Sequence, residues 1–264
     1  MPLFMLFILA VVQGITEFLP ISSSAHLALL HEIGGTTPDD IALDVAVHLG
    51  SIVAVMLYFR ADTARLARGL MRLGDRQSAD SALVRHLIVA TVPAVIVGAV
   101  LALTGWAEAL RDTRVIAATM IVFGVALWWV HRAAPEARSG AGWGRREALV
   151  MGLWQAVALI PGVSRSGICI TAARGLGFAR HDATRLSMLM SIPITLATGA
   201  FLARDLAGAE LGAGFAARAG LAAALAFVAA YGALALMMRF LDRVSFTPYV
   251  IYRIALGVVL LAFA

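Results

Sequence analysis

Long apolar runs recur along the whole chain, and they limit what it can fold into more than any other feature. Six of them are long enough to cross a bilayer, which takes about 17 to 25 mostly apolar residues. They lie near residues 41–59, 83–103, 115–131, 184–203, 215–239 and 247–264. Only 14% of the 264 residues are charged, whereas soluble domains have about a quarter. The sequence therefore predicts an all-α polytopic membrane protein that forms one membrane domain over residues 1–264.

Two further apolar regions, residues 1–30 and 145–172, contain polar residues and a proline near the middle. Proline removes a backbone donor and disfavours helix in the residue before it, so the helix breaks at Leu19-Pro20 and at Pro161-Gly162. We expect each region to form a re-entrant hairpin of two half-helices. Such breaks are tolerated at membrane depth only where the loop is buried in protein or lines a wet cavity.

The arginines are distributed unevenly between the two sides of this predicted bundle. The chain has no lysine, and only four arginines fall on one side: Arg111, Arg114, Arg204 and Arg218. Fifteen fall on the other, which the positive-inside rule makes cytoplasmic: Arg60, Arg65, Arg68, Arg72, Arg76, Arg85, Arg132, Arg138, Arg145, Arg146, Arg174, Arg180, Arg185, Arg239 and Arg243. Basic residues in loops between apolar spans suit membrane lipids and argue against nucleic acid as a partner. Residues 61–80 are predicted to form an amphipathic surface helix.

The two halves of the chain resemble one another. A shift of 142 residues superposes Gln13 on Gln155, Ser22 on Ser164 and Ser24 on Ser166. Each half has one broken region and three spans, and because three is odd, the second half must be inverted relative to the first. We expect inverted-topology repeats at about 1–135 and 145–264. Inverted repeats with broken helices place a binding site near the midplane, where the two loops meet.

The first broken region carries a serine cluster. In QGITEFLPISSSAHL, residues 13–27, Ser22 or Ser23 is a suitable helix cap, and Ser24 follows in the first turn. The free amides and the positive end of that helix favour a phosphate group, so Ser22 and Ser24 are predicted to bind phosphate. Ionisable groups at membrane depth are costly and usually functional, which adds Glu17 and His26 to the candidates.

These groups allow more than one chemistry. Glu17, with Gln13 on the same helix face, can hold a divalent cation or act as a base. Mg²⁺ usually takes one or two carboxylates together with substrate phosphates. Ser23 and His26 form a possible nucleophile–base pair, but His26 is equally suited to be the nucleophile or a base for water. The spacing of these residues does not decide between these roles.

The second broken region, QAVALIPGVSRSGI at residues 155–168, repeats this plan with an arginine. Its helix start offers Ser164, Ser166 and Gly167 to phosphate, and Arg165 adds a planar donor fork. Two opposed helix starts and one arginine predict a pyrophosphate cradle. Purely structural interpretations remain: serines hydrogen-bond neighbouring membrane helices, and Glu17 and Arg165 can simply pair. His48, near Asp44, is interpreted as a packing histidine, and Arg253 as a residue that extends to the membrane surface.

At these two stretches the sequence resembles the bacterial undecaprenyl-diphosphate phosphatases, also called bacitracin-resistance proteins. The resemblance runs from EFLPISSSAHL through PGVSRSG to SIPI at 191–194. It implies hydrolysis of undecaprenyl diphosphate to the monophosphate, which recycles the lipid carrier for cell-wall synthesis. It also implies a bacterial inner-membrane enzyme that opens to the periplasm and depends on Mg²⁺ or Ca²⁺.

The resemblance also implies roles for individual residues. By position, Ser23 and His26 match the catalytic serine and histidine of the family, and Arg165 its phosphate-binding arginine. Glu17 matches the second acid of its acidic motif. Gln13 stands where many members have glutamate, which puts a two-carboxylate metal site in doubt.

We expect the polyprenyl tail to lie between helices and the diphosphate to enter the cavity between the loops. Ser23 with His26 as its partner is the preferred nucleophile, and water activated by His26 or Glu17 is the alternative. A secondary transporter or lipid-phosphate flippase is the alternative function, because inverted repeats and broken helices are typical of transporters. A homodimer is left open.

Overall fold

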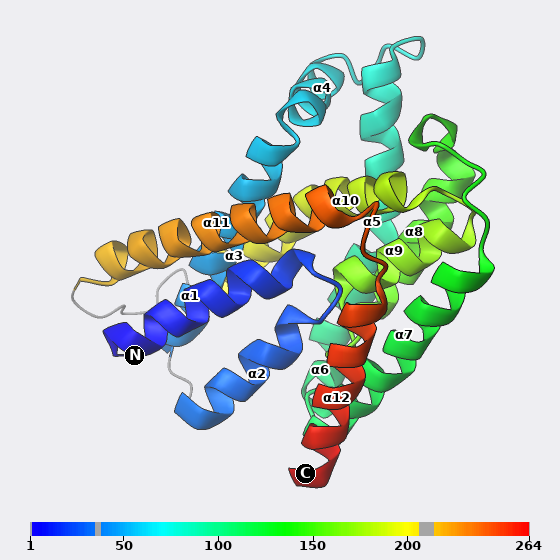
Figure 1. The fold of residues 1–264 in the computed structure, drawn as a ribbon. Coiled ribbons are helices and arrows are strands. Elements are labelled where there is room, and N and C mark those ends of the chain that lie inside the picture. Colours follow the sequence, from blue (N-terminus) through cyan, green and yellow to red (C-terminus); the bar gives the residue numbers. More distant parts are fainter. Residues whose placement is uncertain (1, 35–37, 206–213, 264) are drawn as a thin grey trace.

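The protein is all-α in a computed structural model, which describes residues 2–34, 38–205 and 214–263. Twelve α-helices and one 3₁₀ turn form its secondary structure over that part of the chain (Figure 1). In chain order they are α1 Leu3–Phe18, α2 Ser23–Gly34, α3 Pro38–Tyr58, α4 Arg60–Met71, α5 Ala79–Thr104, α6 Trp106–Ala109, α7 Thr113–Ala133, η1 Gly140–Gly142, α8 Arg145–Val157, α9 Arg165–Gly175, α10 Arg180–Asp205, α11 Phe215–Phe240 and α12 Thr247–Phe263.

Most of the expected spans form continuous helices. In the described residues, five helices are long and apolar enough to cross a membrane, namely α3, α5, α7, α10 and α11. The sixth expected span forms α12, which is shorter at 17 residues. Its length of about 26 Å, at 1.5 Å per residue, is close to the ~30 Å of a hydrocarbon core. The prediction of an all-α polytopic protein is confirmed, and the chain is a multi-pass membrane protein.

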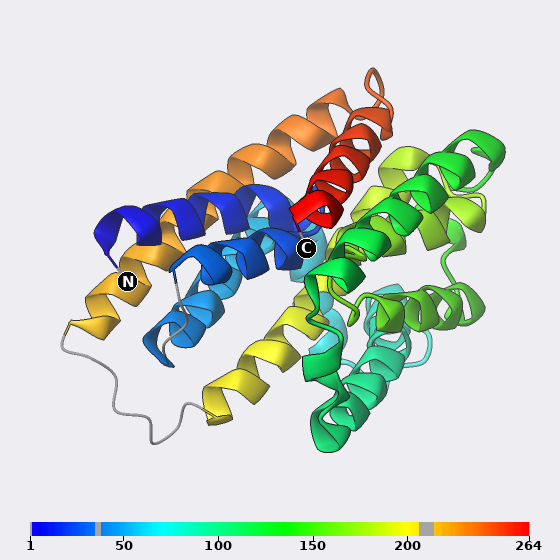
Figure 2. The ribbon, with the colours of Figure 1, turned by 90° about the horizontal axis from the view of Figure 1, so that it is seen from below.

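Both proline-interrupted regions form helical hairpins. Helix α1 ends at Phe18 because Leu19, ahead of Pro20, is extended with φ −69° and ψ 144°. Helix α2 then packs against α1, and Figures 1 and 2 show the pair running side by side. Helices α8 and α9 form the corresponding hairpin in the second half, with a turn that contains Pro161. Neither hairpin contains a helix long enough to cross a bilayer, as expected for re-entrant segments.

Close helix contacts hold the first helix of each hairpin. Helix α1 packs on α11, and a Cβ added to Gly14 would lie 2.6 Å from the carbonyl oxygen of Ala226. Helix α8 packs on α5 in the same manner, and a Cβ on Gly152 would lie 2.6 Å from the Ala90 oxygen. Small residues permit such close backbone approach between membrane helices. Any larger side chain at either glycine would therefore displace a hairpin.

The predicted surface helix is present as α4, although it is shorter than expected. Its arginines pair with the beginning of α5: Arg65 Nε and Arg68 Nε each lie 2.9 Å from an Asp80 carboxylate oxygen. Asp62 of α4 pairs with Arg185 of α10. These ion pairs connect α4 to two spans, so α4 belongs to the membrane domain and is not an independent unit.

Candidate functional site

The two hairpin turns share an unusual backbone conformation. Ser22, just before α2, has φ 73°, and Ser164, just before α9, has φ 71°. They are the only non-glycine residues with positive φ in the part of the chain that the structure describes. Such conformations cost energy, and they occur mostly at functional sites. The two residues are those superposed by the 142-residue shift, so corresponding positions of the two turns share this conformation.

Serine hydroxyls join the two turns to each other. Ser24 Oγ accepts from Gly162 N at 3.4 Å, and Ser166 Oγ donates to the Leu19 carbonyl at 3.0 Å. Within each turn, the hydroxyl two residues earlier lies close by: Ser22 Oγ is 3.1 Å from Ser24 Oγ, and Ser164 Oγ is 3.2 Å from Ser166 Oγ. Ser24 in the first turn and Ser166 in the second therefore each bond the opposite turn, so the starts of α2 and α9 lie close together.

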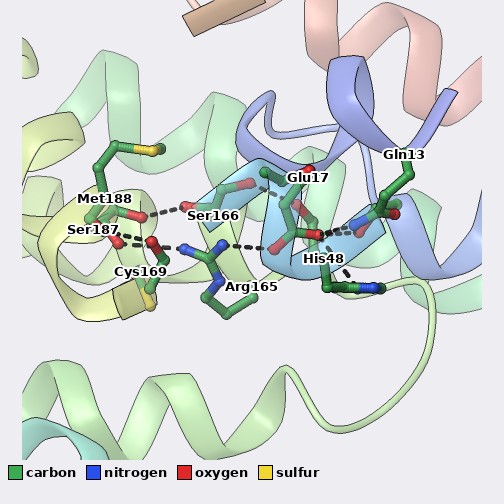
Figure 3. Close-up of polar contacts among 12 residues, drawn as sticks. Gln13, Glu17, His48, Arg165, Ser166, Cys169, Ser187 and Met188 are labelled. Carbon is green, nitrogen blue, oxygen red and sulfur yellow. Dashed lines mark hydrogen bonds and ion pairs between the residues drawn. The ribbon is translucent and has the colours of Figure 1, made fainter. Parts of the chain in front are cut away.

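Where the two turns meet, the central contact is an ion pair between the first and second halves of the chain. Arg165 Nη2, at the start of α9, lies 2.8 Å from Glu17 Oε1 in α1, 148 residues away. The other carboxylate oxygen, Oε2, accepts from Gln13 Nε2 at 2.9 Å and from Ser23 Oγ at 2.8 Å. Figure 3 shows Arg165 on one side of Glu17 and Gln13 on the other. The structure thus brings three predicted site residues around the carboxylate of a fourth.

A cavity of about 430 Å³ opens at this ion pair. Its polar lining includes Glu17, Ser23, Ser24, Ser164 and Arg165. Its apolar lining comes from several helices: Val45 of α3, Ala94 of α5, Leu159 between α8 and α9, and Ile194 and Leu202 of α10. A larger groove of about 790 Å³ lies between α1, α11 and α12 and is almost entirely apolar, so it lacks groups for ionic chemistry. The smaller cavity is the candidate active site.

Three of the predicted phosphate-binding residues do not line this cavity. Ser22 and Ser166 are buried at 1% exposure and hold the turns together. The Gly167 amide donates to Ser164 Oγ at 3.2 Å, so it is already used in a helix cap. Ser24, Ser164 and Arg165 remain at the cavity wall. Fewer of the predicted residues are therefore placed to bind phosphate than expected.

His26 and Ser23 were expected to form a nucleophile–base pair, but each side chain bonds other partners. Its Nδ1 is 2.7 Å from the Ser22 carbonyl oxygen, and its Nε2 is 2.6 Å from the Tyr252 hydroxyl of α12. Because a carbonyl only accepts, Nδ1 carries a proton, and in the neutral ring Nε2 accepts from Tyr252. The serine that was expected to bond His26 instead donates to Glu17.

His48 lines the cavity, although its apolar span predicted a packing residue. Its Nδ1 donates to the Asp44 carbonyl at 2.7 Å, and its Nε2 lies 3.8 Å from Glu17 Oε2. Both His48 and Asp44 line the cavity. Their presence one turn apart in an apolar span was a usable signal, because ionisable residues at membrane depth are functional candidates.

A second acid–base contact involves Asp44, which lines the cavity. His31, at the end of α2, has Nε2 at 2.8 Å from Asp44 Oδ2. This hydrogen bond raises the pKa of His31 above its ordinary value. Arg111 lines the same cavity. The cavity lining therefore carries charge at Asp44 and Arg111, whereas the lining residues contributed by α5 and α10 are all uncharged.

The prediction for Arg253 was wrong. A side chain that extends to the membrane surface would be exposed, but Arg253 has 0% exposure. Its Nη2 donates to the carbonyls of Gly162 and Val163, at 3.0 and 2.8 Å. The apolar composition of α12 gave no indication of this contact, which depends on where α12 crosses the second turn.

The residues expected to bind a metal do not fit a resident metal centre. Both oxygens of Glu17 already accept from Arg165, Gln13 and Ser23, and the nearby guanidinium repels a cation. Gln13 Oε1 is buried without a hydrogen-bond partner, but it is a single spare ligand. Among the described residues, no group of three or more His, Cys, Asp or Glu side chains suits a metal ion.

Known proteins match this chain over almost its full length. The family described as "Bacitracin resistance protein BacA" matches residues 6–259. An "Undecaprenyl-diphosphatase" of Ruegeria pomeroyi is 52% identical over 267 residues, and one of Dinoroseobacter shibae is 51% identical over 266. A third, from Alteromonas mediterranea, is 44% identical over 266 residues. Each alignment covers 100% of this chain and 99% of the relative.

Proposed function

Because the chain belongs to the bacitracin resistance protein BacA family, we propose that it hydrolyses undecaprenyl diphosphate to undecaprenyl phosphate and inorganic phosphate. The observation that carries this proposal is the Glu17–Arg165 pair at 2.8 Å, with the Ser23 hydroxyl on the same carboxylate. An acid, a hydroxyl and a guanidinium around one cavity are the groups that phosphoryl transfer needs.

We propose that the diphosphate enters the 430 Å³ cavity and that Arg165 turns from Glu17 to the phosphate oxygens. The starts of α2 and α9 add the positive ends of two helix dipoles. The prenyl tail leaves along the apolar wall formed by Ala94, Leu159 and Ile194. Because most of a long prenyl chain does not fit in this volume, the tail then lies among helices and membrane lipids.

Glu17 is the base in this arrangement, because Ser23 Oγ donates to its Oε2. Ser23 Oγ attacks the terminal phosphorus, its proton passes to Glu17, and the bond to the bridging oxygen breaks. Undecaprenyl phosphate leaves, and water hydrolyses the phosphoserine to inorganic phosphate. When Arg165 moves to the substrate, Glu17 loses its neighbouring cation and becomes a better proton acceptor. Direct attack by water, activated by Glu17 or His26, is the alternative route.

The function is tested by phosphate release from purified protein. We expect the wild type in detergent, with undecaprenyl diphosphate and Mg²⁺ or Ca²⁺, to release one phosphate per lipid. Arg146→Ala is a matched control because Arg146 is exposed at the start of α8 and lies outside the cavity lining. Absence of release under both metals would contradict the proposal. Movement of the lipid between leaflets without release would instead favour a flippase.

The requirement for Mg²⁺ or Ca²⁺ stays a prediction from the family resemblance, and we assign no catalytic step to the metal. Gln13→Glu tests whether position 13 influences it. The change replaces a donor 2.9 Å from Glu17 Oε2 with a second carboxylate, and two adjacent carboxylates favour a divalent cation. We expect the activity to reach half-maximum at a lower metal concentration, measured by titrating phosphate release.

Gln13→Leu is the control for this titration, because it removes the same donor without adding charge. A metal titration that is identical for wild type and Gln13→Glu would mean that position 13 has no influence on the metal.

We also propose that the protein lies in the bacterial inner membrane with the cavity open to the periplasm, which the arginine distribution supports. The native Cys169 is free and fully buried, so it is a silent background for thiol labelling. In spheroplasts, an impermeant thiol reagent is expected to label Trp106→Cys but to label Arg76→Cys only after lysis. The reverse pattern would invert the orientation.

A further inference from the structure

Arg253 is a buried cation in a helix that the proposed reaction does not use. Its side chain is completely buried in α12, where α12 packs on α7. Among the described residues, no carboxylate forms an ion pair with it, and its Nε and Nη1 have no hydrogen-bond partner. A cation at membrane depth without a counter-charge is costly, and such residues usually have a function.

The hydrogen bonds of Arg253 are all with the turn before α9. Its Nη2 donates to two consecutive carbonyls, those of Gly162 and Val163. The residues on either side of Val163 have positive φ, 88° at Gly162 and 71° at Ser164. A turn with two left-handed residues needs outside contacts to keep one conformation. Arg253 supplies two of them from a different part of the chain.

The neighbouring Gly167 leaves room for this guanidinium, because a Cβ added to Gly167 would lie 3.0 Å from Arg253 Nη1. Gly167 is in the first turn of α9, so the Arg253 guanidinium lies next to the start of that helix. The carbonyls of the turn are directed to α12, while Ser164 and Arg165, next in the chain, face the cavity.

We infer that Arg253 is a positioning residue, which holds the Gly162–Val163 turn so that Arg165 faces Glu17 and the incoming diphosphate. It also places a fixed positive charge behind the α9 start, on the side opposite to the substrate. This inference rests on the proposed hydrolysis. It assigns to α12 a role in phosphate recognition, although Arg253 itself does not line the cavity.

Two substitutions test the inference. Arg253→Met keeps most of the side-chain volume and removes the charge and both hydrogen bonds, whereas Arg253→Lys keeps the charge and one donor group. Because small misplacements of a catalytic group cost about 10²-fold, we expect Arg253→Met to lower kcat about 100-fold with a smaller change in KM. Arg253→Lys should recover at least about tenfold of that loss. Arg243→Met, an exposed arginine before α12, is the control.

A double-variant cycle separates positioning from general stability. If Arg253 acts through Arg165, adding Arg253→Met to Arg165→Ala should lower the residual rate no further. Thermal unfolding in detergent shows whether each variant is folded, and Arg253→Lys serves if Arg253→Met is not. Wild-type kcat in a folded Arg253→Met, or an independent further loss in the double variant, would overturn the inference. An inactive wild type would instead contradict the proposed function.

Discussion

Arg165→Ala is expected to lower kcat/KM by about 10³-fold or more, since a single arginine on a transferring phosphoryl group contributes about this much. Arg165 donates to one oxygen of the Glu17 carboxylate at 2.8 Å, and the Ser23 hydroxyl donates to the other. Phosphate release at saturating and limiting lipid gives kcat and KM separately. Arg165→Lys should recover only part of the loss, because an ammonium lacks the planar donor fork.

The same substitution leaves the Glu17 carboxylate without its cation, so a loss of stability must be separated from a loss of chemistry. Glu17 has a side-chain exposure of only 9%, and an unpaired buried charge destabilises a fold. The double variant Arg165→Ala/Glu17→Gln removes both charges and should unfold at a temperature closer to wild type. It should remain inactive. Near-normal turnover in a folded Arg165→Ala would remove Arg165 from the site.

Ser23→Ala is expected to lower kcat by about 10²-fold or more, which is typical for the loss of an acid–base or nucleophilic group. Glu17→Gln should have an effect of similar size, because it removes the acceptor of the Ser23 proton. Ser51→Ala is a matched control: Ser51 is fully buried in α3, and its hydroxyl donates to the Val47 carbonyl. Its rate should stay close to that of wild type.

Trapping with substrate labelled in the terminal phosphate identifies the nucleophile. Label on Ser23 in the wild type and none in Ser23→Ala is the expected result. Label on His26 would reverse the assignment, although the imidazole is bonded to Ser22 and Tyr252. A Ser23→Ala variant that keeps wild-type kcat while Glu17→Gln is inactive would favour direct attack by water.

The fold could be predicted in most of its parts because each follows from local composition. Apolar length identifies the spans, and the prolines at 20 and 161 identify the hairpin breaks. The internal repeat located the two turns that meet, and the serines at 22 and 164 share the same backbone conformation. Boundaries were less accurate: the expected surface helix over 61–80 ends at Met71.

The candidate site was predicted in its members but not in its contacts. Glu17, Ser23 and Arg165 meet as expected, whereas His26 bonds Tyr252, a residue of the last helix that no motif indicated. His48 faces Glu17, although its span suggested packing. Spacing along one helix says which side chains share a face, but it does not say which helix that face meets.

The sequence by itself determined that this chain crosses a membrane, that its helices break twice, and that polar groups lie where the breaks occur. Those properties follow from the cost of placing charge and unpaired backbone in hydrocarbon, which acts on every segment separately. Only the tertiary structure decided the partners: Arg165 on Glu17 across 148 residues, and Arg253 on the second turn. These pairs depend on how helices far apart in the chain cross, and no local pattern encodes that geometry.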